Sequence, residues 1–199
     1  MGKVYQPNDK YAQRAQQDGF RARSVYKLQE IQERYGIIKP GQKILDLGAA
    51  PGSFMQLIGQ LVGEKGLVIG VDLQLIKPFK APNMHTYQAD INDETVYDRI
   101  ATEHGVERFD VITSDLAPAT TGIKSVDSGR SFELNAQVLN VADMRLKKGG
   151  YVILKSFPGA EQDQLMQRLK NDYRTLRMLV PKAVRQTSRE VYLIGMGKL

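Results

Sequence analysis

Four ionisable residues of this chain, two lysines and two carboxylates, stand where charged side chains could act together. Asp115 and Lys155 each end a short apolar run, Glu190 opens another, and Lys27 lies in a basic stretch near the N-terminus. A lysine that ends a run of buried apolar residues is costly unless it is paired or functional. The spacing alone therefore leaves two readings open: a functional cluster, or an ion-pair network that only closes one end of the fold.

A second candidate site is the loop Asp46-Leu47-Gly48-Ala49-Ala50-Pro51-Gly52-Ser53-Phe54. Small residues let the backbone come close to a ligand, and glycine adopts conformations that other residues avoid. The loop lacks the Gly-Lys-Ser/Thr that grips a triphosphate, and its G-x-x-x-G differs from the dinucleotide fingerprint. An acidic residue before the first glycine, without phosphate-binding residues, suits a cationic nucleoside such as S-adenosylmethionine.

Two further acids, Asp72 and Asp90, end the next two expected strands. A carboxylate at the first position can accept from both ribose hydroxyls of a nucleoside, and the second lies where an adenine amino group would be expected. Either acid alone is more simply a helix cap or a turn residue. Three acids at successive strand ends beside this loop favour a nucleoside site.

Strand-like and helix-like segments alternate along the chain, which predicts an α/β fold with a mostly parallel sheet and helices on both faces. No helix is expected between the last two strands, so they should pair antiparallel. In such sheets ligands bind beyond the carboxyl ends of the strands. The expected strands are 43–47, 66–72, 84–90, 109–115, 151–155, 174–180 and 190–196. The expected helices are 11–17, 23–35, 54–62, 94–104, 131–148 (ended by Gly149-Gly150) and 161–171, with a surface loop at 120–129.

The length of 199 residues suits one domain. We expect a core over 43–199 and an N-terminal basic helical appendage over 1–42. The absence of Cys excludes disulfides, a thiolate nucleophile and Cys-ligated metals, and two His make a His-rich metal site improbable, so no metal is expected. Residues 1–7 contain no apolar h-region and no apolar run approaches the length of a membrane span, so we expect neither a secretory signal nor a transmembrane segment. We expect a cytoplasmic monomer.

Positive charge gathers at the two ends of the sequence. Residues 1–43 hold nine basic and four acidic residues, 174–199 hold six and one, and 44–173 hold thirteen and seventeen. A cluster of Lys and Arg indicates a polyanion-binding surface, although a surplus of +6 can also be an ordinary solvated surface. The ends form one patch only if the fold brings them together.

The chain resembles the FtsJ/RrmJ-type RNA 2′-O-ribose methyltransferases nearly from end to end. The resemblance rests on residues 21–28 (RARSVYKL), 46–52 (DLGAAPG), 114–118 (SDLAP), 154–155 (LK) and 188–192 (SREVY). Bacterial ribosomal members often have Gly-Trp where this chain has Ser53-Phe54, so an aromatic residue is kept.

The resemblance implies a Rossmann-like S-adenosylmethionine-dependent methyltransferase fold, with a seven-stranded, mostly parallel sheet whose last strand is antiparallel. It implies a catalytic tetrad of Lys27, Asp115, Lys155 and Glu190. With the loop argued above, the expected cofactor-binding residues are Asp46, Gly48, Ala50, Pro51, Gly52, Phe54, Asp72, Asp90 and Asp115.

The compact size and residues 18–23 resemble the bacterial enzymes that methylate a uridine of 23S ribosomal RNA. The same chemistry on tRNA or another RNA, and a non-catalytic RNA-binding ribosome assembly factor, remain alternatives. An amino methylase would place Pro-Pro and an aromatic after the acid at 115, and a nicotinamide dehydrogenase would need a third glycine and a Tyr–Lys pair.

The expected reaction moves a methyl group to a ribose 2′-oxygen, with Lys155 as the base and Asp115 and Glu190 orienting the amines and the hydroxyl. Burial and the second amine of Lys27 would favour the neutral, proton-accepting form of an amine. RNA contacts are expected from Arg21, Arg23, Arg185 and Arg189. The wider basic patch should also include Arg174, Arg177 and Lys182.

Overall fold

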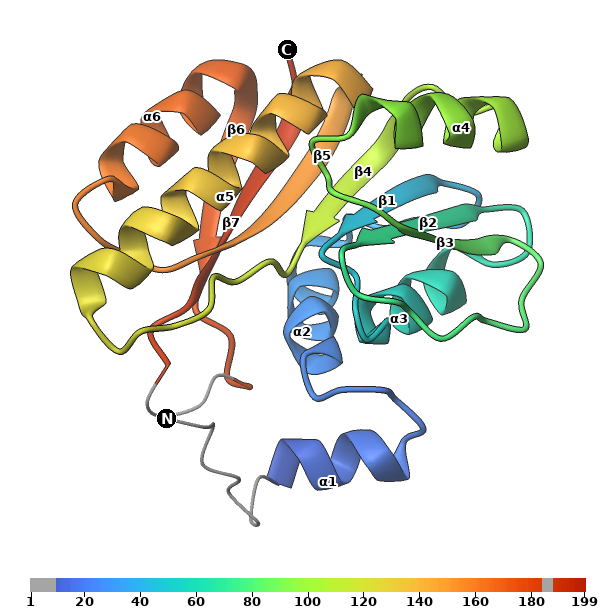
Figure 1. Cartoon of the computed structure of the whole chain (residues 1–199), viewed down its shortest axis with the longest axis horizontal. Coiled ribbons are helices and arrows are strands. Elements are labelled where there is room, and N and C mark those ends of the chain that lie inside the picture. Colours follow the sequence, from blue (N-terminus) through green and yellow to red (C-terminus); the bar gives the residue numbers. More distant parts are fainter. Residues whose placement is uncertain (1–9, 184–187) are drawn as a thin grey trace.

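The computed structural model describes residues 10–183 and 188–199 and has a seven-stranded sheet at its centre (Figure 1). The strand order is β3-β2-β1-β4-β5-β7-β6. The strands are β1 (Lys43–Leu47), β2 (Leu67–Asp72), β3 (Met84–Gln88), β4 (Phe109–Ser114), β5 (Leu146–Ser156), β6 (Tyr173–Leu179) and β7 (Val191–Lys198). The helices are α1 (Lys10–Gln17), α2 (Val25–Tyr35), α3 (Ser53–Val62), α4 (Glu94–His104), α5 (Lys124–Arg145) and α6 (Gln162–Asp172).

The pairing of the strands confirms the predicted sheet. β1 lies between β2 and β4 in parallel, β3 and β5 extend the sheet in parallel, and β7 is antiparallel to both β5 and β6. The central strands β1, β2 and β4 are almost continuously buried, as expected for strands with helices on both sides.

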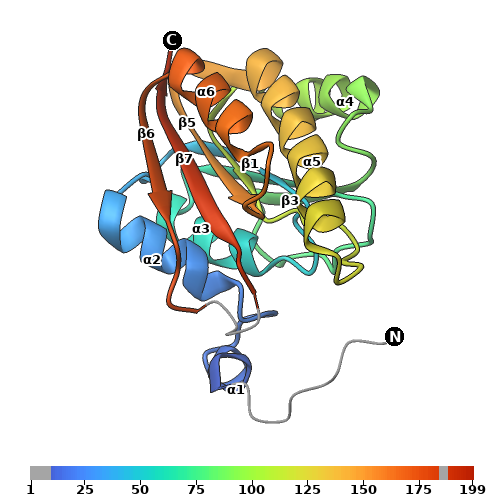
Figure 2. The same ribbon diagram turned by 90° about the vertical axis from the view of Figure 1, so that its left-hand side faces the viewer.

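Helices cover both faces of the sheet (Figure 2). The apolar residues of α4, α5 and α6 pack in one buried cluster with the sheet, whereas those of α2 and α3 belong to a second cluster on the opposite face. Tyr97, Leu139 and Leu169 are typical of the first cluster, and Leu28 and Ile58 of the second. Within the described residues, no helix is both long and apolar enough to cross a membrane.

The register brings the candidate site residues to one end of the sheet. Leu47 lies opposite Val71 and Ser114, and Ser114 lies opposite Leu154. Asp72, Asp115 and Lys155 therefore follow directly at the carboxyl ends of neighbouring parallel strands. In β7, Tyr192 is the partner of Lys155, so the segment preceding this strand reaches the same end.

Helix α5 begins earlier than predicted, at Lys124, so much of the expected loop 120–129 is helical. The carboxylate of Asp127 accepts hydrogen bonds from the amides of Thr121 and Gly122, at 2.7 and 3.1 Å. These bonds fix the chain that enters the helix. Buried Ser128 and Ser131 then pack in the first two turns. Tertiary contacts thus override the low helix propensity of Ser and Gly.

The prediction that α5 runs to Lys148 and ends at Gly149-Gly150 is wrong. The helix ends at Arg145, and Leu146 already pairs with Phe109 of β4. The register then shifts, because the next pair is Val111 with Tyr151. Gly149, with φ of 76°, lies inside this irregularity, where a left-handed residue is needed for the strand to bulge. The two glycines therefore belong to an irregular part of β5 and do not end a helix.

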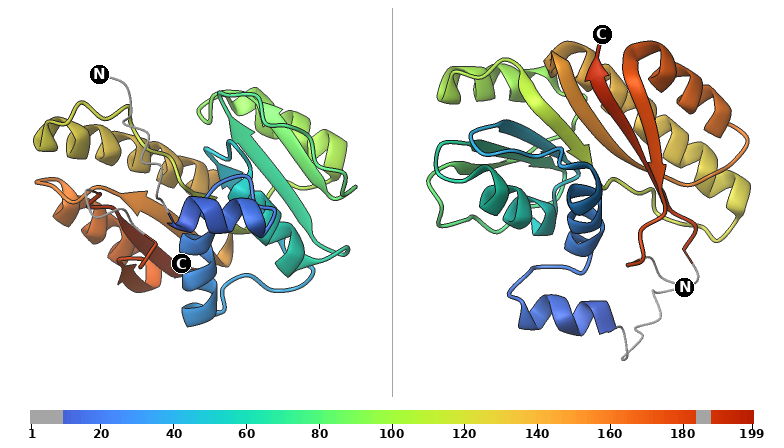
Figure 3. Two further views of the ribbon diagram at one scale, coloured as in Figure 1. Left: turned by 90° about the horizontal axis from the view of Figure 1, so that it is seen from below. Right: turned by 180° about the vertical axis from the view of Figure 1, so that it is seen from behind.

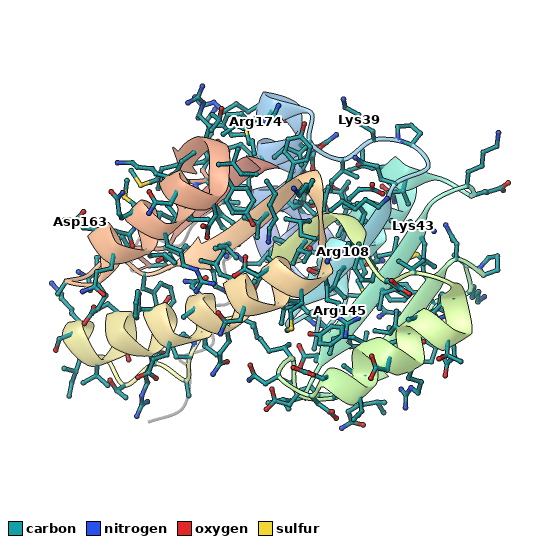
Figure 4. The ribbon with its side chains drawn as sticks, turned by 90° about the horizontal axis from the view of Figure 1, so that it is seen from above. Lys39, Lys43, Arg108, Arg145, Asp163 and Arg174 are labelled. Carbon is teal, nitrogen blue, oxygen red and sulfur yellow. The ribbon has the colours of Figure 1, made fainter. Side chains whose placement is uncertain are left out.

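Basic residues lie at the amino ends of several strands (Figure 4). Arg108 donates to the carbonyl of Leu146, and Arg145 pairs with Asp98 at 3.4 Å. Arg174, labelled in the same view, lies near the beginning of β6. These side chains lie at the end of the sheet opposite the candidate site.

Candidate active site

The four residues of the expected tetrad meet at the carboxyl end of the sheet as two linked pairs. Lys155 Nζ lies 3.0 Å from Asp115 Oδ1 and also donates to the main-chain carbonyl of Asp115. Lys27 Nζ forms an ion pair with Glu190 Oε1. Lys27, Lys155 and Glu190 expose only 8%, 7% and 7% of their surfaces. Such buried charges persist only when they are paired.

Electrostatics join the two pairs into one group. Burial by itself raises the pKa of Asp115, but the ammonium groups of Lys155 and Lys27 and the hydrogen bonds from Tyr192 and Lys155 outweigh it and leave that pKa below its ordinary value. Asp115 is therefore a carboxylate that can orient an amine and accept a hydrogen bond.

Tyr192 is a member of the site that sequence reasoning missed. Its fully buried hydroxyl donates to Asp115 Oδ1, the same oxygen that faces Lys155. Burial, followed by the charges of Asp115 and Glu190, raises the pKa of Tyr192 well above its usual range, so the hydroxyl remains a donor. The available signal was strand alternation, since Tyr192 stands two residues after Glu190 and so shares its face.

Helix α2, which carries Lys27, is anchored to α3 where the cofactor loop ends. The hydroxyls of Ser24 and Ser53 share a hydrogen bond of 2.7 Å, and the amide of Arg21 donates to Gln56 Oε1 at 2.7 Å. On its other side, Glu30 accepts from the amide of Lys182, at 2.8 Å. These contacts place α2, and with it Lys27, relative to the loop and to the chain after β6. Figure 3 shows α2 between α3 and the C-terminal strands.

The loop after β1 is shaped by glycines with positive φ, namely Gly48 at 72° and Gly52 at 103°. A Cβ on Gly48 would lie 2.4 Å from Leu116 Cδ2, and one on Gly52 would lie 2.7 Å from Arg21 Nη1 and 2.8 Å from Phe79. Both positions therefore require glycine for close packing within the protein, in addition to any approach of a ligand.

Asp46 is the most unusual carboxyl of the site. It is 1% exposed, its Oδ1 accepts from Thr113 Oγ1 at 2.6 Å, and its Oδ2 has no hydrogen-bond partner. Burial, reinforced by the charges of Asp115 and Asp72, raises the pKa of Asp46 to about 8, although the Thr113 bond opposes the shift. An unsatisfied buried oxygen is rare in native proteins and is consistent with a place for a cationic or donating ligand.

The remaining expected cofactor residues differ in their surroundings. Asp72 is buried, and its two oxygens accept from the amides of Ala50 and Gln74, each at 2.8 Å, which ties β2 to the loop. Asp90 is exposed and caps a turn by accepting from the amide of Asn92. Phe54 is 3% exposed and packs in the core cluster of α2 and α3.

Two of the arginines expected to bind RNA make contacts within the protein. Arg21 donates to the carbonyls of Pro51 and Pro78 at 3.0 and 3.1 Å, and its guanidinium carbon lies 3.9 Å from the centre of the Phe79 ring. Arg23 donates to the carbonyl of Ala183. The Arg21 side chain therefore connects the cofactor loop, at Pro51, to the segment that contains Pro78 and Phe79.

The C-terminal basic residues divide between the two ends of the sheet. Arg189 is exposed beside Glu190, and Arg185 lies outside the described residues. The prediction that Arg174 flanks the same groove is wrong: Tyr173 pairs with Lys198, whereas Leu179 pairs with Tyr192. Arg174 is therefore separated from Glu190 by nearly the whole length of β6, because a strand advances about 3.3 Å per residue.

The sequence profile described as "FtsJ-like methyltransferase" matches residues 20–198 of this chain. Two curated relatives are each called ribosomal RNA large subunit methyltransferase E. The protein of Syntrophobacter fumaroxidans is 44% identical, with 96% of both chains covered. The protein of Bdellovibrio bacteriovorus is 42% identical, with 98% of this chain and 99% of the relative covered.

Solved structures give the same picture of the fold. A ribosomal RNA methyltransferase of Plasmodium falciparum superposes with a TM-score of 0.80 at 28% identity, covering 90% of this chain and 99% of that one. Fibrillarin of Aeropyrum pernix, solved with S-adenosyl-L-methionine, superposes with a TM-score of 0.59 at 16% identity, covering 87% and 76%. The second similarity concerns the fold alone.

Proposed function

Because the chain belongs to the FtsJ-like methyltransferase family, we propose that it transfers a methyl group from S-adenosylmethionine to a ribose 2′-oxygen of large-subunit ribosomal RNA, most simply at a uridine of 23S RNA. The observation that carries the ribose assignment is the pairing of Lys155 with Asp115 and of Lys27 with Glu190 at one strand end. The names of the relatives support the ribosomal substrate.

The residues at the carboxyl end of the sheet fit a cationic nucleoside cofactor. Asp46 offers a buried oxygen without a partner. Asp72 is held in place by two backbone amides and keeps further acceptor sites. Gly48, Ala50, Pro51, Gly52 and Asp90 would complete the site. When bound, S-adenosylmethionine supplies an electrophilic methyl group on a sulfonium sulfur.

Lys155 is the group best placed to take the proton from the ribose hydroxyl. A neutral amine has two N–H donors and one lone pair. Asp115 provides two acceptors for Lys155 Nζ, its carboxylate and its main-chain carbonyl. Those acceptors can satisfy the two donors and leave the lone pair for the hydroxyl proton. The bond from Tyr192 fixes the carboxylate that orients the amine.

Lys27 and Glu190 have a positioning role in this proposal. Their buried ion pair holds two polar groups near Asp115, where they can orient the hydroxyl. Positioning of reactants can contribute roughly 7–11 kcal/mol to lowering a barrier. A general base contributes about 10²–10⁴-fold in rate. Loss of the base should therefore be severe, and loss of the whole arrangement more severe still.

The test is transfer of a tritiated methyl group to large ribosomal subunits, and separately to free 23S RNA, taken from cells that lack the protein. Ribose 2′-O-methylation blocks alkaline cleavage of the adjoining phosphodiester, so the label should be recovered in an alkali-resistant dinucleotide. Comparison of Lys155→Ala with wild type should show a loss of transfer with cofactor binding retained.

Lys148→Ala is the matched control, because Lys148 is an exposed lysine on the same strand. It should transfer at the wild-type rate. Label recovered in alkali-sensitive nucleotides would replace the ribose by a base as the acceptor. Near-normal transfer by Lys155→Ala would remove Lys155 as the base, and RNA binding without any transfer would favour the assembly-factor alternative.

A further inference from the structure

A cleft of about 560 Å³ opens beside the tetrad. Its size lies within the range of about 300–1,000 Å³ that is typical of small-molecule sites. Its walls come from the start of α2, the turn before α5, the chain after β5 and the segment before β7. The residues used below are Lys27, Lys124, Asp127, Phe157, Arg189 and Glu190.

This cleft is distinct from the cofactor region. It shares Lys27 and Glu190 with the tetrad, but neither the loop 46–54 nor Asp72, Asp90 or Asp115 lines it. The tetrad therefore has the strand ends and the glycine-rich loop on one side and this cleft, with Phe157, on the other. A group-transfer site needs such an arrangement, because the two substrates must reach the reacting atoms from different sides.

Phe157 gives the cleft an aromatic surface tied to the proposed base. It stands two residues after Lys155, and its amide donates to the hydroxyl of buried Ser131 at 3.0 Å. Asn135 fixes the same stretch by donating to the carbonyl of Lys155 at 3.0 Å. These hydrogen bonds hold the backbone that carries both Phe157 and Lys155.

The charge of the cleft suits a nucleotide. Lys27 and Glu190 neutralise one another, and the Asp127 carboxylate is occupied by the backbone of Thr121 and Gly122. Of the other cations in the lining, Arg23 donates to the carbonyl of Ala183, and Lys124 and Arg189 are exposed at the rim. Aromatic faces stack bases without regard to sequence, and flanking cations bind phosphates.

We propose that this cleft holds one unstacked nucleotide, the one whose ribose is methylated, with its base on the ring of Phe157 and its neighbouring phosphates at Lys124 and Arg189. The inference rests on the proposed function. A paired nucleotide presents its 2′-hydroxyl in the wide, shallow minor groove of an A-form helix, whereas the tetrad is recessed, with Lys155 only 7% exposed. The nucleotide must leave the stack to reach it.

The sequence contains no Trp, so Phe157→Trp places a single fluorescent indole at the proposed stacking surface. Titration with a short oligouridylate should quench its emission saturably. Tyr35→Trp, at the far end of α2, is the control for absorption and nonspecific binding and should show no saturable quenching. Absence of quenching in Phe157→Trp, or equal quenching in both variants, would overturn the proposal.

Kinetics with ribosomal RNA supply a second readout. Phe157→Ala should raise the KM for RNA by about 5- to 150-fold, the range for loss of one stacked base. Phe157→Tyr should restore most of it, and S-adenosylhomocysteine affinity should not change. Unchanged KM in Phe157→Ala together with normal transfer would refute the cleft and leave the proposed function standing. Saturable quenching without any methyl transfer would support nucleotide binding in the cleft and refute the proposed function.

Discussion

Lys27 and Glu190 form a buried ion pair although they come from opposite ends of the chain, Lys27 from the first turn of α2 and Glu190 from the residue before β7. Their side chains are only 10% and 9% exposed. The contact explains how an N-terminal helix outside the strand–helix alternation becomes part of the site. It also joins the two basic ends of the sequence in space.

We expect the loss of either member of this pair to destabilise the fold. Removing one partner of a buried pair leaves an uncompensated charge and costs about 3–5 kcal/mol. Lys27→Met and Glu190→Gln should each lower the free energy of unfolding in urea by roughly this amount, and the double variant should cost less than the sum.

The control for these variants is the exposed pair of Arg99 and Glu103. Arg99 Nε and Glu103 Oε1 lie 3.7 Å apart, and the two side chains are 58% and 48% exposed. Arg99→Met should cost at most about 0.5 kcal/mol. Equal losses at the buried and exposed pairs would contradict the assignment of Lys27 and Glu190 as a coupled buried pair.

Asp46 should make stability depend on pH. Burial raises its pKa to about 8 from the ordinary 3.8. Between these values the folded protein keeps a proton that the unfolded chain has lost. The free energy of unfolding therefore falls as pH rises through this window, by up to about 1.4 kcal/mol per unit.

Asp46→Asn has no such proton to keep. Its advantage in stability over wild type should grow from about pH 5 to about pH 8 in urea unfolding. Asp98→Asn, at a carboxyl 77% exposed, should run parallel to wild type across the same range. Parallel curves for Asp46→Asn would show that this carboxyl titrates normally.

Arg21 should influence the cofactor more than the RNA. It clamps the carbonyl of Pro51 in the cofactor loop and stacks on Phe79. Arg21→Ala should weaken S-adenosylhomocysteine binding in calorimetry by about tenfold, corresponding to loss of one or two net hydrogen bonds. Arg21→Lys should recover little, because lysine lacks the planar fork.

Arg14→Ala is the control, since Arg14 pairs with Asp18 at the exposed end of α1. A large loss of RNA affinity in Arg21→Ala with unchanged cofactor affinity would return Arg21 to the direct RNA contact expected from its charge.

Most of the sheet could be predicted because its strands are short apolar runs between clear turn residues, as in Lys43–Leu47 and Leu67–Asp72. The start of α5 could not, because it depends on the burial of Ser128 and Ser131 and on the amides of Thr121 and Gly122 donating to Asp127, none of which helix propensity contains. The glycines at 149–150 were misinterpreted as a helix stop because a left-handed glycine, here Gly149, occurs both at helix ends and at strand irregularities.

The tetrad was placed by strand ends together with the family resemblance, and the structure brings its four side chains into two linked pairs. Tyr192 was missed because a tyrosine in an apolar strand reads as core packing, and only the register with Lys155 shows where its hydroxyl points. The single domain, the monomer and the cytoplasmic location stay predictions.

Charge alone could not tell which basic residues face the RNA, and the register of β6 with β7 now separates them. Arg189 lines the cleft, whereas Arg174 lies at the other end of β6.

Each phosphate contact to single-stranded RNA adds about 0.7 to the slope of log affinity against log salt. Arg189→Ala should therefore lower the slope by roughly this amount and weaken binding of all sequences alike. Arg174→Ala removes the same charge from the same C-terminal segment and should leave slope and affinity unchanged. Filter binding of an oligoribonucleotide at several salt concentrations measures both. Equal effects of the two substitutions would mean that net charge, and not the cleft, attracts the RNA, and an affinity independent of salt would refute a basic binding surface altogether.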